Sequence, residues 1–177
     1  IHRDTLLSTG TTKVTVSNAD QSWNIFLSDP TNMHKTASVS LYWEGDTEYM
    51  PLMTGTVERV EYRGPAVPIF IRARQDPMLG FQIGSGQGVK EYDTAGAWNA
   101  ADLVWEILTD IGGVDDTASS ANTDIDYDRW VEWKSFLSGR ASSIKARFTG
   151  QSIQTALLNI ASLTVSWIWV NNEGKFS

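Results

Sequence analysis

The spacing of apolar residues changes once along this 177-residue chain, and that change constrains the fold most strongly. Between residues 12 and 74, apolar and polar residues alternate, as in KVTVS and VPIFIRA. Beyond residue 99, apolar residues recur at intervals of three and four. Strict alternation is typical of half-buried antiparallel strands, and the longer intervals are typical of amphipathic helices. We therefore predict an α+β fold.

The first part of the chain is expected to form an antiparallel β-barrel-like domain over residues 1–80. Several short strands with hairpin spacing favour a small barrel or sandwich. The step from Val57 to Val60 breaks the alternation, which predicts a β-bulge or a change of register. The expected strands are KVTVS, SWNIFL, SVSLYW, VERVEY and VPIFIRA, with a hairpin turn at EGD.

The second part is expected to be a mixed region of three helices and short strands over residues 99–177, after an irregular glycine-rich linker at 81–98. Asn99 can cap the first helix, and Gly112 with Gly113 can end it. Helices are predicted over 99–111, 127–138 and 151–162, strands over IKARF and VSWIWV, and a hairpin turn at NNEG.

Composition and charge exclude some classes of function. The formal net charge of −7 argues against a nucleic-acid surface, and no run approaches the ~20 apolar residues of a membrane span. Residues 91–132 hold eleven acids and one base, whereas residues 133–150 hold four bases and no acid. These are either two solvated faces or surfaces that meet a neighbouring subunit. Because the chain starts at Ile1 and stops in mid-pattern at Ser177, we expect a fragment of a longer protein.

Three alternate aspartates, Asp124, Asp126 and Asp128, are the first candidates for a chemical site. They do not fit an EF-hand loop, because Arg129 stands where that loop needs glycine and Ser135 where it needs glutamate. A looser calcium site and a pair of catalytic carboxylates stay open as alternatives. The preferred interpretation is structural: Asp126 or Asp128 caps the helix that follows.

Trp167 and Trp169 are the second candidates, because a strand beside a turn would place both rings on one face. Such a pair can bind a sugar or a protein partner, but burial in the core is the interpretation that we favour. No G-x-S-x-G elbow and no pair of histidines at metal-ligand spacing occurs. We therefore expect no enzyme activity and no cofactor.

Three phrases of the second half, taken in order, resemble tail-hub and tail-tip proteins of long-tailed bacteriophages and prophages. They are NAADLVWEILTDIGGVDD, NTDIDYDRWVEWKSFL and KARFTGQSIQTALLNIASLTVSWIWVNNEGKFS. The first half is similar in PLMTGTVERVEY, where Thr54 and Gly55 form the step into a hub barrel. The matching residues of the second half are Asn99, Ala101, Asp102, Trp105, Leu108, Thr109, Asn122, Asp124, Ile125, Asp126, Gly150, Ala156, Leu157, Ile160, Glu173, Gly174 and Lys175.

The resemblance implies a structural protein of the tail tip or baseplate hub, found in the virion. Such hubs form rings, commonly trimers, of β-barrels with an inserted α/β region, and they contact other tail proteins. The resemblance transfers no catalytic residue to this chain. The alternative is a carbohydrate-binding or host-adhesion module. That module predicts exposed Trp167 and Trp169 beside a groove, whereas a hub predicts that they are buried.

Overall fold

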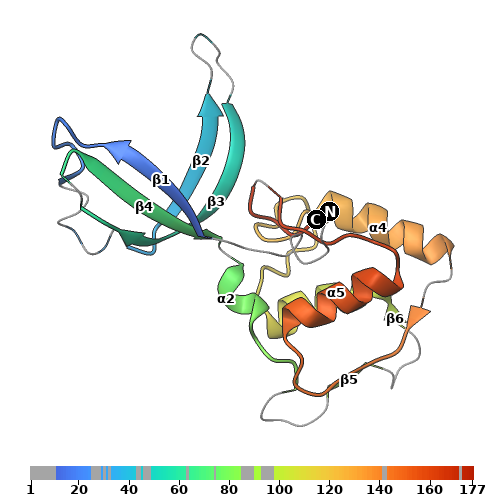
Figure 1. The fold of residues 1–177 in the computed structure, drawn as a ribbon. Coiled ribbons are helices and arrows are strands. Elements are labelled where there is room, and N and C mark those ends of the chain that lie inside the picture. Colours follow the sequence, from blue (N-terminus) through green and yellow to red (C-terminus); the bar gives the residue numbers. More distant parts are fainter. Residues whose placement is uncertain are drawn as a thin grey trace. The chain divides into compact units, whose positions relative to one another are not determined.

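The structure is a computed structural model of a mixed α+β chain (Figure 1). It describes residues 11–24, 29, 31, 33–42, 45, 49–62, 64–73, 75–84, 90–92, 98–140, 143–171 and 173–177. The chain divides into two compact units. We call residues 77–171 with 175–177 the helical unit, and the strands up to Asp76, together with Glu173 and Gly174, the sheet unit.

The sheet unit is a curled sheet of four antiparallel strands, which forms a half-barrel (Figure 1). The strands are β1 (Thr11–Ser17), β2 (Thr36–Tyr42), β3 (Tyr49–Val60) and β4 (Ala66–Ala73). Their order is β1-β4-β3-β2. Among the described residues β1 and β2 each pair on one side only, so the predicted barrel is an open half-barrel there.

Alternation in β4 builds the core of the sheet unit. Val67, Ile69 and Ile71 are buried on one face, together with Val57 of β3. The register of β3 against β4 shifts between Val57 and Arg59, which confirms the bulge predicted from the broken alternation. The predicted strand SWNIFL is wrong where it can be seen, because Ser22 and Trp23 form a turn and Asn24 is helical. Residues 25–27, Trp43 and both neighbours of Gly45 in the predicted EGD turn lie outside the described residues.

Gly55 sits where β3 approaches β4 too closely for a side chain. A Cβ at this position would lie 2.3 Å from the backbone oxygen of Arg72 and 2.9 Å from the side chain of Ile71. A backbone oxygen held in a sheet cannot move aside as a flexible side chain can, so only glycine fits without a shift of the strands.

We expect Gly55→Ala to lower the free energy of unfolding by about 3 kcal/mol, because the added methyl overpacks the contact between β3 and β4. Urea unfolding followed by circular dichroism measures this change. Gly139→Ala is the control, because a Cβ at Gly139 meets nothing within 4 Å. A Gly55→Ala chain as stable as the Gly139→Ala chain would contradict this explanation.

The helical unit contains the three predicted helices and one more. They are α3 (Ala100–Glu106), which continues into the π-helical stretch η3 (Ile107–Ile111), α4 (Tyr127–Gly139) and α5 (Ile153–Leu163). A short helix, α2 (Asp76–Leu79), was not predicted. The predicted strand IKARF is divided into β7 (Ser143–Ile144) and β8 (Ala146–Phe148). These pair with β6 (Trp98–Asn99) and β5 (Lys90–Tyr92), which start and end inside or beside the predicted linker.

The predicted strand VSWIWV is wrong for most of its length. Residues 165–169 form no regular strand, and only Val170 makes an isolated bridge, to Phe176. The chain nevertheless turns back, because Trp169 and Ser177 exchange two backbone hydrogen bonds of 3.0 and 2.9 Å. None of the described helices combines the length and the apolar character needed to cross a membrane.

Candidate functional site

The structure gives the three alternate aspartates three different environments. Asp124 is buried, and its Oδ2 accepts a hydrogen bond from the backbone N–H of Asp115 (2.9 Å). Asp126 is the N-cap of α4, where its Oδ1 accepts a hydrogen bond from the N–H of Arg129 (3.3 Å). Asp128 is exposed in the first turn of α4. No group of three or more His, Cys, Asp or Glu suited to a metal ion occurs among the described residues.

Asn122 organises the loop in front of α4, a role that its sequence position did not reveal. Its side chain is fully buried. Its Nδ2 donates to the backbone oxygens of Asp115 (2.8 Å) and Thr117 (3.0 Å). Its Oδ1 accepts from the backbone N–H groups of Asp124 (2.9 Å) and Ile125 (2.7 Å). The amide thus makes the four hydrogen bonds that an asparagine side chain can make.

Asn122→Ala should lower the free energy of unfolding by about 3 kcal/mol, because it removes the partner of four backbone groups, two of which are buried. Chemical denaturation is the measurement. Asn159→Ala, on the exposed side of α5, is the matched control and should change stability little. Equal losses in the two variants would show that the loop does not depend on Asn122.

Asp115 closes the same loop with its carboxylate. Its Oδ1 accepts hydrogen bonds from the hydroxyl (2.6 Å) and the N–H (3.0 Å) of Thr117, and its Oδ2 accepts from the N–H of Thr123 (2.9 Å). These bonds favour the charged form, and they lower the pKa of Asp115 to about 2, with the Thr117 hydroxyl as the largest cause.

The chain is therefore expected to lose stability in acid. The unfolded state binds a proton at Asp115 near pH 3.9, before the folded state does. The stabilisation is complete above about pH 4 and disappears as the pH falls through 2. Asp115→Asn should flatten the dependence of the urea midpoint on pH between 4 and 2.5, whereas Asp116→Asn, at the exposed neighbour, should not. Identical pH profiles for wild type and Asp115→Asn would contradict this origin.

Asn99 caps α3 and also ties it to α4. Its Oδ1 accepts a hydrogen bond from the N–H of Ala101 (2.9 Å). Its Nδ2 donates to the hydroxyl of Ser138 (2.9 Å), near the end of α4. Asp102, three residues after Asn99, pairs with Lys134 of α4 (2.7 Å). These polar contacts fix α4 across α3.

A cavity of about 380 Å³ lies in the helical unit between α4 and the segment Ser166–Trp169. Its buried wall comes from α3 and η3, through Val104 and Leu108. We call this cavity the aromatic groove. Its aromatic lining includes Trp105, Trp130, Trp133, Phe136, Trp167 and Trp169.

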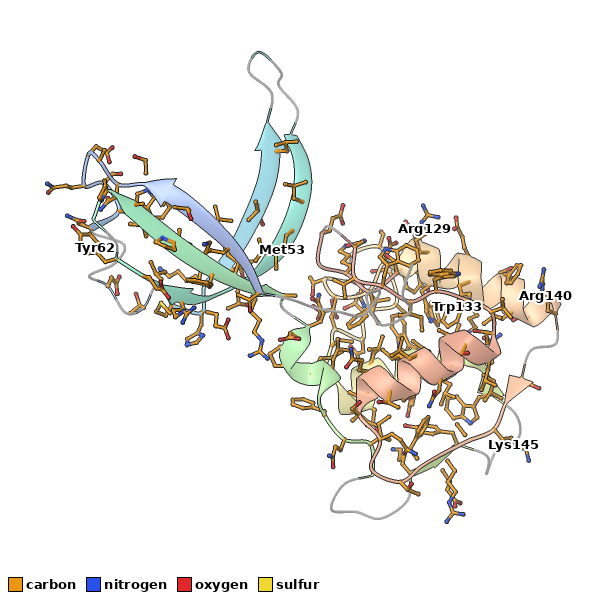
Figure 2. The ribbon with its side chains drawn as sticks, in the orientation of Figure 1. Met53, Tyr62, Arg129, Trp133, Arg140 and Lys145 are labelled. Atoms are coloured by element: carbon orange, nitrogen blue, oxygen red, sulfur yellow. The ribbon has the colours of Figure 1, made fainter. Side chains whose placement is uncertain are left out.

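Two tryptophans hold the walls of the aromatic groove together. Trp130 packs on Trp105 with ring centroids 4.6 Å apart, and its Nε1 donates to the backbone oxygen of Ala101 (3.1 Å). Trp133, in the middle of α4, donates from its Nε1 to the hydroxyl of Ser166 (2.8 Å) (Figure 2). The groove is therefore a built feature of α3, α4 and the chain after α5.

Trp167 and Trp169 lie on the outer wall of the aromatic groove. Their exposed fractions are 54% and 39%, so the expectation that they pack in the core is wrong. The error follows from the segment Val165–Trp169, which was read as a strand of a sheet. Since it forms no strand, its two rings face the groove and the solvent instead of an inner layer.

The turn between α5 and this segment carries two further exposed apolar residues. Leu163 is 72% exposed and Val165 is 89% exposed. Ser166 N–H donates to the oxygen of Ala161 (2.8 Å), and Val165 N–H donates to the oxygen of Ser162 (3.4 Å). This is the Schellman pattern of a helix end, and its left-handed position usually holds glycine. Here it holds Val165, with φ of 52°.

Charged residues are missing from this part of the sequence. Residues 148–172 contain no Asp, Glu, Lys, Arg or His, yet they include four exposed apolar side chains: Leu163, Val165, Trp167 and Trp169. Depletion of charge together with enrichment of tryptophan is the compositional signal of an interface core. The groove and the turn thus have the chemistry of a surface that is covered by a partner.

Comparison of the chain with protein-family models, with curated proteins and with solved structures finds no match. The function is therefore argued from the residues and the geometry of this chain.

Proposed function

We propose that this chain is a structural component of the tail tip or baseplate hub of a long-tailed bacteriophage or prophage. It acts through subunit assembly, without catalysis, in the virion. The observation that carries this proposal is the aromatic groove together with the uncharged segment Leu163–Trp169 beside it, which exposes Trp167 and Trp169. A large contiguous apolar surface on a water-soluble unit marks a site of association.

The polar groups around the groove favour a protein segment over a sugar as its occupant. A sugar needs free donors and acceptors for its hydroxyl groups, in addition to an aromatic face. The hydroxyl of Ser166 already accepts from Trp133 and donates to the oxygen of Thr164 (3.2 Å). At the rim, Arg129 and Glu132 pair with each other (3.7 Å). The hydroxyl of Ser166 therefore has no free proton to donate to a ligand that is mostly hydroxyl.

The carboxylates of the aspartate stretch also support a structural role. Asp124 and Asp126 are bonded to backbone N–H groups, so they shape the entry of α4 instead of facing a substrate. The resemblance to tail-hub proteins supplies the rest of the proposal. It implies other tail proteins as partners and a homo-oligomeric ring, with a trimer expected.

The carbohydrate-binding or host-adhesion module has one specific observation in its favour. That module predicts Trp167 and Trp169 exposed beside a groove, and both are exposed there. A hub subunit accommodates this exposure only if a neighbouring subunit covers the two rings in the assembly. The two functions therefore differ in what covers the groove.

Light scattering after size exclusion, over a range of concentrations, tests the hub proposal. A hub that forms trimeric rings predicts a mass that is a multiple of three chains at the upper end of the range. A strict monomer or a simple dimer would contradict the ring. A glycan array tests the rival. It predicts sugar binding that Trp167→Ala/Trp169→Ala abolishes and that Phe81→Ala, at an exposed aromatic outside the groove, preserves.

A further inference from the structure

We propose that two copies of this chain dock on each other about a two-fold axis through their helical units. The turn Leu163–Val165 of each copy fills the aromatic groove of the other, and the two α4 helices run antiparallel. This contact goes beyond the proposed function, because it needs neither a ring nor another tail protein.

The backbone at Val165 is the first observation behind this contact. A β-branched residue in the left-handed region is strained, and the Schellman position that Val165 occupies favours glycine. The side chain is 89% exposed, so its packing against the described residues does little to offset the strain. Local strain of this kind is typical of residues that serve binding. The valine is thus best explained by a partner that covers it.

The position of the turn points to a second copy of the same chain. The turn and the aromatic groove are parts of one patch, because Ser166 and Trp167 follow Val165 directly and line the groove. A second, smaller cavity of about 140 Å³, lined by Val165 and Trp167 among others, lies on the same patch. A two-fold contact uses the same patch on both subunits, so it needs a projection and a hollow side by side. This patch offers both.

The charges of α4 are complementary to those of an antiparallel copy. Asp128 lies in the first turn of α4, and Arg140 lies at the C-terminal end of this helix. Figure 2 labels Arg140 at that end and Arg129, the neighbour of Asp128, near the other end. Neither Asp128 nor Arg140 takes part in an ion pair within the part of the chain that the structure describes. An antiparallel α4 brings Arg140 of one copy to Asp128 of the other, twice about the axis.

The space between these two ends is suited to burial. Phe136 is 49% exposed and stacks under the guanidinium of Arg140, 4.1 Å from its centre. Arg129 and Glu132 form an ion pair, so an uncharged turn that packs beside them does not bury either charge without its partner. The patch therefore has an apolar centre with one unpaired charge of each sign at its ends, which sets the direction of docking.

Substitution of Val165 tests the docking turn. Val165→Gly should raise the thermal midpoint of the chain, because it relieves the left-handed valine, and should weaken self-association at least about tenfold. Val165→Asp should abolish association, because it places a charge in the groove. Phe81→Ala, outside the patch, should leave association unchanged. Sedimentation velocity gives the dissociation constants. Unchanged association in Val165→Gly and Val165→Asp would overturn the proposal.

A charge exchange tests the direction of docking. Asp128→Arg alone and Arg140→Asp alone each set like charges against each other and should weaken association about tenfold. The double variant Asp128→Arg/Arg140→Asp restores opposite charges and should recover most of the wild-type affinity. If the single substitutions act only by destabilising α4, their losses of association should add in the double variant. Thermal melts of all three variants measure such a loss of stability. Additive loss of association would overturn the antiparallel contact.

The mass of the wild-type chain separates this inference from the proposed ring. The two-fold contact predicts an assembly with an even number of chains, either a dimer or two trimers joined face to face. Val165→Asp should then halve the mass of this assembly. A trimer that Val165→Asp leaves intact supports the ring and overturns the two-fold contact. A dimer that Val165→Asp dissociates supports the contact and contradicts the ring. A monomer at every concentration overturns both.

Discussion

Burial of the apolar face of α3 is the interaction on which the helical unit depends. Ala100, Ala101, Leu103 and Val104 are buried, and η3 continues the buried run with Ile107. The charged residues of α3, Asp102 and Glu106, are not buried, and Asp102 pairs with Lys134 of α4. The helix α3 is also short, so the elements around it cannot all be covered by it. Of the thirteen residues of α4, only Leu137 is buried.

The aromatic groove follows from this arrangement. Because α4 contributes one buried residue to the core, most of its packing comes from the large rings of Trp130 and Trp133, which are partly buried against that core. Among the described residues, the chain after α5 meets α4 through the bond from Trp133 to Ser166, and it meets the cap of α4 through bonds from Asn171 and Ser177 to Asp126. Between these contacts lies apolar surface that neither element covers. Contiguous apolar surface of this kind is typical of sites where proteins associate.

The sequence predicted correctly those elements whose structure follows from a local pattern of buried residues or from a capping side chain. The alternation of β4 and the broken alternation near Val57 both reflect burial on one face, and the helix ends at Asn99 and Asp126 reflect local capping. The segment after Val165 could not be predicted in this way. Its alternating valines and tryptophans have strand character, but the chain first makes the left-handed turn at Val165, and among the described residues it pairs only at its end, where Trp169 and Val170 meet Phe176 and Ser177. The role of Asn122 was hidden for another reason: its four partners are backbone groups, which leave no trace in side-chain spacing.

The central claim is that the surface formed by the groove and the turn at Val165 is covered by another copy of the chain. Photo-crosslinking from position 165 tests it most directly, with a benzophenone amino acid in place of Val165 and a mixture of isotopically light and heavy chains. The account predicts crosslinks between light and heavy chains, with the attachment sites in α4 and in Ser166–Trp169. Crosslinks found only within one chain, or between chains at sites outside the groove, would contradict it.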